Sequence, residues 1–442
     1  MIKKNRWIYK ELKKEINNER IVHLCGQRRT GKTTLFQELN RDTPNSEYIF
    51  IKENQDIYDI MDYINNSQNQ IFFLDEITNI KNIELLNYLY DECIRVHNKK
   101  IFITSTNSLE IYLMRNSILA DRVYTIPIYP LGLPEYVDVI LDKESYNRKD
   151  YIEFINCGGF FTEFDGKQQI DFIINSFYRS ITKVNDNIMD KEELRLSILN
   201  IMIKLVWDNS FIPDRIEKLV DNRKINSIQQ KIIEKEFNIS KDTQLIYYNF
   251  SKTVEYLLNM GIIKFIPDIS GMNGKFILLN IPIQIYLYRE ITNELNKNRI
   301  ETSQFNISFW GKIFENIMIT SNSIQTNYKQ FCYDRGIHGE VDDILIENNN
   351  LYLLEYKSNP NFQINGHENF IFANKEEENK IREIVEIQNI YKLYVYPGIT
   401  QKEKNLFNNL EINRLVNTSK LHTILNDNTS QEIATNKGMF WE

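Results

Sequence analysis

Residues 26–33 read Gly-Gln-Arg-Arg-Thr-Gly-Lys-Thr, a stretch that fills every position of the pattern G-x-x-x-x-G-K-S/T. The apolar run at 21–25 before it predicts a strand, and residues 32–41 predict a helix. A loop between such a strand and helix directs backbone N–H groups at phosphate oxygens, and the helix N-terminus adds partial positive charge. The sequence therefore predicts a site for the phosphates of a nucleotide.

Several positions of this loop have expected roles. Lys32 is expected to reach the β- and γ-phosphates, and the Thr33 hydroxyl is expected to bind Mg²⁺. Gly26 and Gly31 permit the tight backbone turn that brings the N–H groups together. The complete set of expected nucleotide contacts is Gly26, Gln27, Arg28, Arg29, Thr30, Gly31, Lys32, Thr33, Thr34 and Asp75.

The composition favours a globular protein of several domains. The chain has 442 residues, of which 42% are hydrophobic and 26% are charged, and this length predicts two or three domains. A formal net charge of −7 excludes a global electrostatic attraction to nucleic acid. The basic residues among positions 1–20 are more simply explained as a solvated helix face than as a phosphate-binding arm.

Neither the cysteines nor the apolar runs indicate secretion or a membrane. The four cysteines form no C-x-x-C pair, which disfavours a zinc cluster and a disulfide framework and favours a reducing cytoplasm. No apolar run approaches the ~18 residues of a membrane span, and the charged N-terminus develops no signal-peptide core. We therefore expect a cytoplasmic protein that does not contact a membrane.

Residues 20–130 alternate short apolar runs with helical stretches, which predicts an α/β fold with a parallel sheet and crossover helices. The expected strands are 21–25, 47–52, 70–75, 100–105 and 123–128. The expected helices are 32–41, 56–66, 81–96 and 108–116.

The third expected strand ends in two acids. Residues 71–74 are Ile-Phe-Phe-Leu, typical of a strand buried on both faces, and Asp75 and Glu76 follow at the end where parallel sheets bind ligands. Asp75 is expected to hold the Mg²⁺ shell, and Glu76 to orient or deprotonate the attacking water. Alone, the two acids would more simply predict a helix N-cap, but beside a phosphate loop they predict an ATPase site.

Several segments resemble one archaeal and bacterial family. GQRRTGKTTL (26–35), FFLDEI (72–77), ITSTNS (103–108), LADRV (119–123) and PIYPLGLPEY (127–136) have its order and spacing, and CGGFF (157–161) resembles its Gly-Gly-Phe-Pro element. The family comprises AAA-type ATPases related to the signal-transduction (STAND) class, with a winged helix and a nuclease-like C-terminal domain. Ser105, Asp121 and Phe161 depart from the family pattern. The resemblance covers nearly the whole chain and is strongest over 20–136.

The resemblance adds two catalytic candidates. In an AAA-type sheet the strand at 100–105 lies between the two motif strands, so a polar side chain after it can sense the γ-phosphate. Thr106 is the first choice for this role and Asn107 the second. Arg122 is a candidate for neutralising charge during phosphoryl transfer, and a plain surface arginine is an equally good interpretation.

Residues 141–300 are expected to form a helical lid and a winged helix. The apolar spacing at 198–205 is that of a buried helix face. The winged-helix order of helix, turn, helix and hairpin is expected at 232–237, 238–240, 242–260, 262–267 and 275–281. The second helix carries a single lysine, Lys252, so we expect a packing and relay module rather than a reader of DNA sequence.

Residues 301–442 contain a second group of acids. A polar turn at 347–350 separates two apolar runs and predicts a hairpin. Side chains alternate along a strand, so Glu355 and Lys357 are expected on one face, with Asp342 close to them on the neighbouring strand. Two carboxylates are suited to holding Mg²⁺ or Mn²⁺, and Lys357 is suited to orienting the attacking water.

This segment resembles the PD-(D/E)xK nuclease fold, an α/β restriction-endonuclease-like domain. Asp342, Glu355 and Lys357 fall on its motif positions, and Glu315, on a helix expected at 309–319, falls on its first-helix acid. The resemblance implies a metal site formed by Asp342, Glu355 and Glu315. An E-x-K pattern also occurs on many exposed strands, so phosphodiester cleavage stays an open alternative to a domain that keeps only the fold.

Two functions are expected for the whole chain, with domains at 1–140, 141–300 and 301–442. In the first, a Mg²⁺-dependent ATPase gates a nuclease-like domain that acts on DNA. In the second, a STAND-like signalling ATPase carries a non-catalytic C-terminal binding module. The sequence has no Asn-Lys-x-Asp guanine-reading motif, which favours ATP over GTP. A homo-oligomer is expected if Arg122 acts across a subunit boundary.

Overall fold

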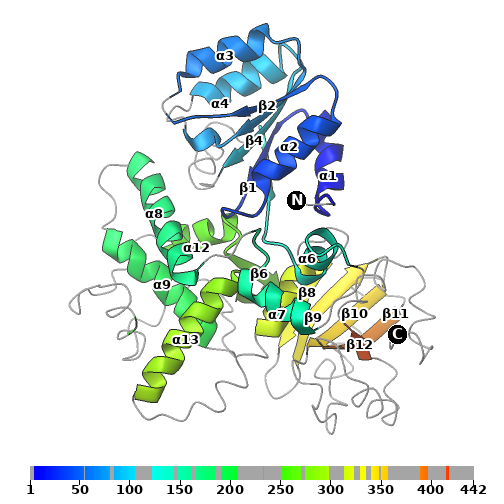
Figure 1. Cartoon of the computed structure of the whole chain (residues 1–442), viewed down its shortest axis with the longest axis vertical. Helices are drawn as coiled ribbons and strands as arrows, with labels where there is room; N and C mark the ends of the chain where they lie inside the picture. Colours follow the sequence, from blue (N-terminus) through cyan, green and yellow to red (C-terminus); the bar gives the residue numbers. More distant parts are fainter. Residues whose placement is uncertain are drawn as a thin grey trace.

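The computed structural model describes residues 4–53, 55–79, 84–105, 122–143, 148–161, 165–184, 191–207, 232, 250–269, 274–297, 313–322, 329–334, 340–347, 350–356, 389–396 and 415–417. Figure 1 shows a sheet covered by helices at the top, a group of helices below it on the left, and a second sheet below it on the right.

The first sheet has five parallel strands in the order β2-β3-β4-β1-β5. They are β1 (Ile21–Cys25), β2 (Ser46–Phe50), β3 (Ile71–Asp75), β4 (Lys100–Ser105) and β5 (Val123–Pro127). The α/β fold predicted from the sequence is confirmed, and β4 lies between β1 and β3 as expected. The interior strands β1, β3 and β4 are almost wholly buried, which explains their continuous apolar runs.

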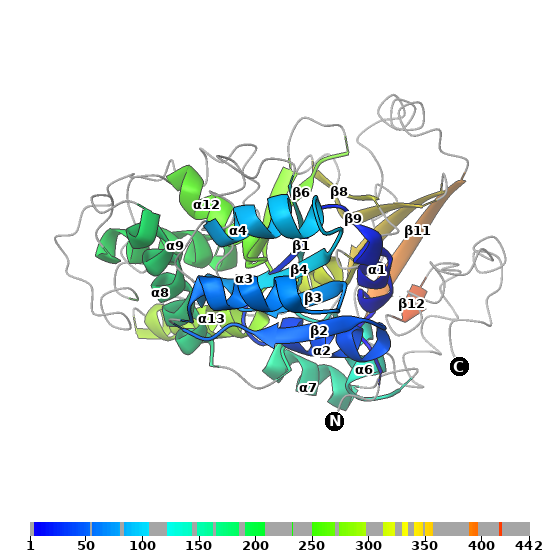
Figure 2. The ribbon, with the colours of Figure 1, turned by 90° about the horizontal axis from the view of Figure 1, so that it is seen from above.

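Helices cover both faces of this sheet (Figures 1 and 2). On one face, α1 (Tyr9–Lys14) and α2 (Lys32–Asp42) share a core with the strands, in which the Phe36 ring lies 5.3 Å from that of Phe73. On the other face, α3 (Ile57–Asn66) and α4 (Glu84–Tyr88) pack with Phe72 and Ile101. The alternation of Phe72 and Phe73 between the faces follows from the strand period of two.

The helix expected at 81–96 differs in detail. It is α-helical from Glu84 and becomes a π-helical turn at Leu89–Ile94. The helix expected at 108–116 lies outside the described residues.

The described part of the middle of the chain is mainly helical, as its apolar spacing predicts. Its helices are α6 (Leu133–Val139), α7 (Arg148–Cys157), α8 (Gly166–Val184), α9 (Lys191–Trp207), α12 (Phe250–Asn259) and α13 (Ile281–Lys297). Phe177 of α8 stacks on Tyr256 of α12, with ring centroids 4.1 Å apart. Both rings are buried, and their stacking stabilises the packing of α8 against α12.

An antiparallel hairpin follows α12. Its strands are β6 (Ile263–Pro267) and β7 (Gly274–Leu278), with Ile263 paired to Leu278. The second strand expected at 275–281 is therefore too long, because the chain leaves the strand and enters α13 at Ile281. Of the expected helix at 232–237 the structure describes Ile232 alone, and of that at 242–260 it describes residues 250–260.

The second sheet is mixed, in the order β12-β11-β10-β9-β8. Its strands are β8 (Lys329–Asp334), β9 (Glu340–Glu347), β10 (Asn350–Tyr356), β11 (Asn389–Tyr396) and β12 (Leu415–Asn417). The hairpin expected here corresponds to β9 and β10, which pair antiparallel, whereas β10 and β11 pair parallel. A helix at residues 313–322 precedes β8.

One hydrophobic core joins the middle of the chain to this second sheet. Ile201 and Leu287 of the helices belong to the same buried cluster as Phe314, Leu345 and Leu354. No helix in the described part of the chain is both long and apolar enough to span a bilayer.

Candidate nucleotide-binding site

The phosphate loop joins the end of β1 to the start of α2. Gly26 has a φ of +153°, and a Cβ there would lie 2.2 Å from the Ile128 carbonyl oxygen. Gly31 precedes α2 with a φ of +88°, and a Cβ there would lie 2.5 Å from the Phe161 ring. Glycine is required at both positions because the backbone is in the left-handed region and neighbouring atoms leave no room for a side chain.

Lys32 is buried inside the loop. Its Nζ donates hydrogen bonds to the carbonyl oxygens of Gly26 and Gln27, both at 2.8 Å. Burial lowers the pKa of Lys32 to about 8, although the nearby Glu76, Cys25 and Asp75 favour its charged form. Within the described part of the chain this ammonium group donates to backbone oxygens, and a phosphate would offer it stronger, charged acceptors.

Asp75 and Glu76 lie at the end of β3, at the same edge of the sheet. Asp75 is buried, and the Tyr48 hydroxyl donates to its Oδ2 at 2.8 Å. The Thr104 hydroxyl donates to Asp75 Oδ1 and accepts the backbone N–H of Glu76 at 2.9 Å. Glu76 has a φ of +59°, a conformation that non-glycine residues adopt rarely and that clusters at functional sites.

Thr104 is a residue of this candidate site that the sequence pattern did not predict. The register of β3 and β4 pairs Leu74 with Ile103 and so places Thr104 beside Asp75. The polar residue predicted from the sequence, Thr106, lies outside the described residues, as does the second choice, Asn107. Aligning the C-terminal ends of the two neighbouring strands would have indicated Thr104. One strand ends in Asp75, and the last residues of the other are Thr104 and Ser105.

Arg122 lies at the opposite edge of the sheet from the loop. Its carbonyl accepts the N–H of Ile21, the first residue of β1, whereas the loop follows the last residue of that strand. The Arg122 guanidinium pairs with Asp91 at 3.2 Å and lies over the Tyr90 ring. The structure therefore does not bring Arg122 to the loop of its own chain.

The remaining loop residues face several directions. Thr33 is exposed at the start of α2, and Thr34 is half-buried. The exposed Arg28 lies with its guanidinium 4.6 Å from the centre of the Phe172 ring, and the carbonyl of Arg29 accepts the N–H of Phe161 at 3.2 Å. The loop is thus covered from one side by the segment at 157–161 that resembles the Gly-Gly-Phe-Pro element.

Arg6 connects the N-terminal segment to the loop. Its Nη1 donates to the carbonyls of Thr30 at 2.7 Å and Tyr129 at 3.1 Å, and its other nitrogens form a bidentate pair with Glu135 of α6. Both charged side chains are almost fully buried, at 4% and 1% exposure. The Thr30 hydroxyl also donates to the Gln27 carbonyl at 2.9 Å. The loop is therefore held by fixed contacts on this side too.

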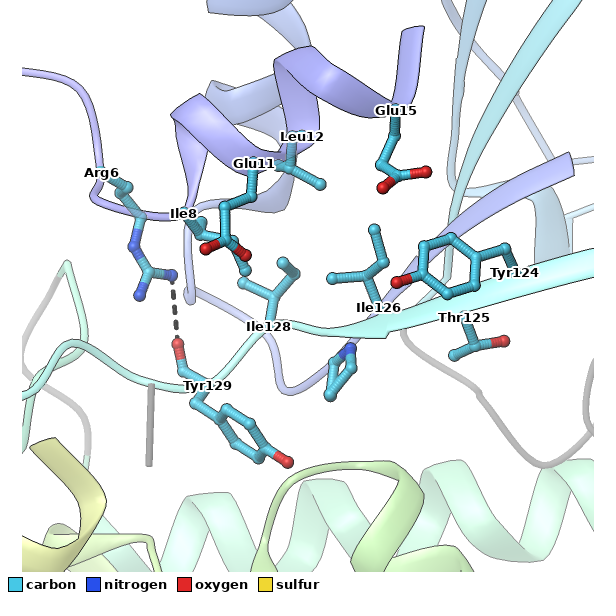
Figure 3. A pocket seen from close by; sticks show the side chains of 11 residues that line it. Arg6, Ile8, Glu11, Leu12, Glu15, Tyr124, Thr125, Ile126, Ile128 and Tyr129 are labelled. Carbon is cyan, nitrogen blue, oxygen red and sulfur yellow. Dashed lines mark hydrogen bonds between the residues drawn. The ribbon is translucent and has the colours of Figure 1, made fainter. Parts of the chain in front are cut away.

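A cavity of about 270 Å³ lies next to Arg6 (Figure 3). Ile8, Glu11 and Leu12 line it from the side of α1. Ile126 and Ile128 line it from the side of β5. Because Arg6 both lines this cavity and binds the Thr30 carbonyl, the cavity is adjacent to the phosphate loop.

The expected C-terminal site is only partly described. Asp342 Oδ2 accepts the backbone N–H of Tyr356 at 2.7 Å, and Glu315 accepts a hydrogen bond from Lys275 of the β6–β7 hairpin at 2.8 Å. The register of β9 and β10, extended by one residue from Leu354–Asp343, places Glu355 opposite Asp342. The side chain of Glu355 and the whole of Lys357 lie outside the described part of the chain. Within the described part, no group of three or more His, Cys, Asp or Glu side chains is placed to hold a metal ion.

The family comparison supports the interpretation of the first sheet and its loop. Residues 18–137 match the model of an AAA domain. This AAA domain contains the phosphate loop, Asp75, Glu76 and all five parallel strands. The chain thus has an AAA-type P-loop domain near its N-terminus.

Solved structures give weaker likenesses. A variant of Thermotoga maritima RuvB is 17% identical with a TM-score of 0.27, and the match covers 61% of this chain and 88% of that one. The Thermotoga maritima RuvB Holliday junction branch migration motor is 16% identical with a TM-score of 0.28, covering 66% and 94%. Protein VC1899 from Vibrio cholerae is 10% identical with a TM-score of 0.17, covering 94% and 99%. No curated protein matches the chain.

Proposed function

We propose that the AAA domain binds ATP with Mg²⁺ and hydrolyses it slowly. The observation that carries the proposal is the meeting of Lys32, Asp75 and Glu76 at one edge of the sheet, where Glu76 and Asp75 act electrostatically on the Lys32 ammonium. A buried cation, a buried carboxylate and a second acid beside them are the groups that phosphoryl transfer to water requires.

The donor set suits magnesium. Thr33 offers a hydroxyl at the start of α2, and Asp75 offers a carboxylate held by Tyr48 and Thr104. Such oxygen ligands are those that Mg²⁺ prefers, and the ion would neutralise charge on the phosphates.

The chain's own residues have distinct tasks in this mechanism. Lys32 exchanges the carbonyls of Gly26 and Gln27 for the phosphates. Thr104 fixes both the Asp75 carboxylate and the Glu76 backbone, so that the Glu76 carboxylate is positioned to orient the attacking water. The loop glycines allow backbone N–H groups to approach the phosphate oxygens.

Two variants test this function. Lys32→Ala is expected to abolish nucleotide binding, because it removes the cation inside the loop. Glu76→Gln is expected to bind ATP but not to turn it over, because an amide cannot accept the proton of water. Binding is measured by equilibrium titration and turnover by phosphate release. Equal hydrolysis by the wild type and Glu76→Gln would remove the role assigned to Glu76.

The cavity beside Arg6 is our proposed site for the nucleotide base. It adjoins the loop and is lined by Ile8, Leu12, Ile126 and Ile128, which suit the faces of an aromatic ring. Leu12→Trp is expected to fill it and to weaken ATP binding while leaving the binding of inorganic triphosphate unchanged. Equal losses for both ligands would contradict this placement.

We propose further that the ATPase gates the C-terminal domain, which acts on DNA as a nuclease. Support comes from the helix at 313–322, which carries Glu315, and from the pairing of β9 with β10, which sets Asp342 opposite Glu355. Plasmid and linear DNA incubated with Mg²⁺ or Mn²⁺, with and without ATP, test this activity, with Asp342→Ala and Lys357→Ala as inactive controls that keep ATPase activity. Absence of cleavage under all conditions would favour the alternative, a STAND-like switch with a non-catalytic C-terminal module.

Arg122 is proposed to act only across a subunit boundary, since it lies away from the loop of its own chain. In that case a mixture of Lys32→Ala and Arg122→Ala proteins recovers part of the ATPase activity, because each mixed pair contains one complete site. A mixture as inactive as its components would remove Arg122 from the mechanism.

A further inference from the structure

The phosphate loop holds both ends of the β6–β7 hairpin through one side chain. Gln27 Nε2 donates to the carbonyl of Gly261, just before β6, at 2.8 Å. Gln27 Oε1 accepts a hydrogen bond from Asn280, just after β7, at 2.6 Å. The backbone N–H of Leu279 donates to the Ile262 carbonyl at 2.8 Å and closes the base of the hairpin between these two contacts.

These contacts lie in the interior of the protein. Gln27 is 5% exposed and Asn280 is fully buried. Asn280 also donates to Gln169 of α8, and its Oδ1 accepts the N–H of Ile283 at the start of α13. A buried amide that loses its partners is costly, so a shift of Gln27 must be followed by its neighbours.

A lysine of the same hairpin contacts the C-terminal domain. Lys275 of β7 donates from Nζ to Glu315 Oε1 and to the Asp342 carbonyl, both at 2.8 Å. The side chains of Lys275 and Glu315 are 9% and 12% exposed, so the ion pair is desolvated. Glu315 and Asp342 are two of the acids that the proposed nuclease site needs. Separating a buried pair of this kind is costly unless another cation takes the place of the lysine, because separation leaves a charge without a partner.

Nucleotide binding acts on the other end of this path. Lys32 donates to the Gln27 carbonyl, and phosphate binding requires that ammonium for itself. The peptide of Gln27 then loses a charged partner while its side chain still holds the hairpin. A change at the loop is thus delivered to the base of β6 and β7, and the paired strands carry it to Lys275.

We propose that the β6–β7 hairpin couples the phosphate loop to the C-terminal acids, so that phosphate binding shifts the hairpin and withdraws Lys275 from Glu315. The coupling rests on the proposed ATP-binding function and on the C-terminal acids as a working site. In the paired state Lys275 neutralises Glu315, and in the withdrawn state another cation takes the place of Lys275 beside the Glu315 carboxylate. Because coupling is reciprocal, breaking the Lys275–Glu315 pair must also change the affinity for nucleotide.

Amide hydrogen exchange of the full-length protein tests this coupling, with a non-hydrolysable ATP analogue and Mg²⁺ as the ligand. In the wild type, saturating analogue is expected to speed exchange in residues 313–322 and 340–347 by about tenfold. In Lys275→Met exchange is already fast without the analogue and does not respond to it. The analogue also binds this variant several-fold more tightly, as reciprocity requires.

A matched control lies on the neighbouring strand. Lys264 of β6 also reaches the second sheet, where it donates to Gln330 Oε1 at 3.3 Å, but this partner is neutral. Lys264→Met is expected to keep the response of the wild type. Lys275→Met alone leaves the Glu315 carboxylate buried without its cation, which can disturb folding. The double variant Lys275→Met/Glu315→Gln removes both charges and avoids this problem. It is expected to show the same fast exchange, without a response to the analogue, as Lys275→Met.

The outcomes separate the coupling from the proposed function. If the analogue binds the wild type but exchange in both segments stays constant, or if Lys275→Met responds like the wild type, the coupling is wrong and ATP binding stands. If the analogue does not bind the wild type at all, the proposed ATP function is wrong and the coupling falls with it.

Discussion

At the scale of single residues, Thr104 joins the two acids of the proposed ATPase site. The Thr104 hydroxyl contacts both the Asp75 carboxylate and the Glu76 backbone, at the point where β3 ends. Groups that orient catalytic residues in this way usually matter almost as much as the residues themselves.

Thr104→Val is expected to reduce kcat for ATP by about 10–100-fold with little change in KM, because valine has the shape of threonine but no hydroxyl. Thr104→Ser, which keeps the hydroxyl, is expected to retain most of the activity. The measurement is steady-state phosphate release. A valine variant with wild-type kcat would show that β3 positions the acids without help from β4.

The pKa of Lys32 predicts opposite effects of pH on stability and on nucleotide binding. Burial lowers this pKa from an ordinary 10.5 to about 8. Between these values the unfolded chain binds the proton and the folded chain does not, so the free energy of unfolding rises with pH. Nucleotide affinity falls above pH 8, because the phosphates need the charged form. Titrations from pH 7.5 to 9.5 check both effects in the wild type. In Lys32→Met, which is not expected to bind nucleotide, the rise in the free energy of unfolding with pH should be absent.

The sequence predicted the charged residues of the site and missed the hydroxyl that connects them. Lys32, Asp75 and Glu76 follow from spacing along the chain, which a sequence displays directly. The position of Thr104 follows from the register of β3 and β4, and Thr104 and Asp75 are 29 residues apart in the sequence. Register depends on side-chain packing across the sheet, which no local pattern encodes.

At the scale of elements, the start of α2 and the segment around Phe161 fit each other. Gly31 has a left-handed backbone, and the Phe161 ring occupies the space that a side chain at this position would need. In the family that the sequence resembles, proline occupies the position of Phe161. In this chain an aromatic ring therefore packs against the phosphate loop at Gly31.

Gly31→Ala is expected to lower the free energy of unfolding by about 1–2 kcal/mol from backbone strain, plus a contribution from the contact with Phe161. In a Phe161→Ala background only the strain remains, so the cost of Gly31→Ala should be smaller there. Chemical denaturation of the four proteins of this double-mutant cycle measures the difference. Equal costs in both backgrounds would show that Phe161 moves away freely.

The boundary between β7 and α13 shows why element limits were harder to predict than element types. Residues 275–281 read as a strand because the apolar run continues to Ile281. The structure ends β7 at Leu278, and Asn280 caps α13 through its side chain. An asparagine followed two residues later by Pro282 is a helix-start signal, and it outweighs the apolar run.

At the scale of the whole molecule, buried polar contacts join distant parts of the chain to the loop. Arg6 and Glu135 bridge the N-terminal segment, α6 and the loop, while Gln27 bridges the loop and the hairpin. The Arg6–Glu135 and Gln27–Gly261 contacts link residues more than a hundred positions apart. A single sequence offers no signal for them, since they depend on how completed elements pack.

Arg6→Met is expected to lower the free energy of unfolding by about 3–5 kcal/mol, because it leaves the Glu135 carboxylate buried without its cation. The double variant Arg6→Met/Glu135→Leu should cost less than the sum of the two single changes. The exposed pair of Arg95 and Asp91 is the control, and Arg95→Met should cost only about 0–1 kcal/mol. Equal effects at both sites would show that burial does not strengthen the dependence on Arg6.

The reach of Gln27 has a consequence for how the protein is made. Its partners Gly261 and Asn280 follow it by 234 and 253 residues. Translation adds about 5–20 residues per second, so a nascent chain carries its phosphate loop for roughly 10–50 s before these partners emerge from the ribosome. During that interval a complete motif is present but its side chain has no hairpin to hold. Maturation of the loop therefore follows translation of the hairpin, although the loop itself is translated well before the hairpin.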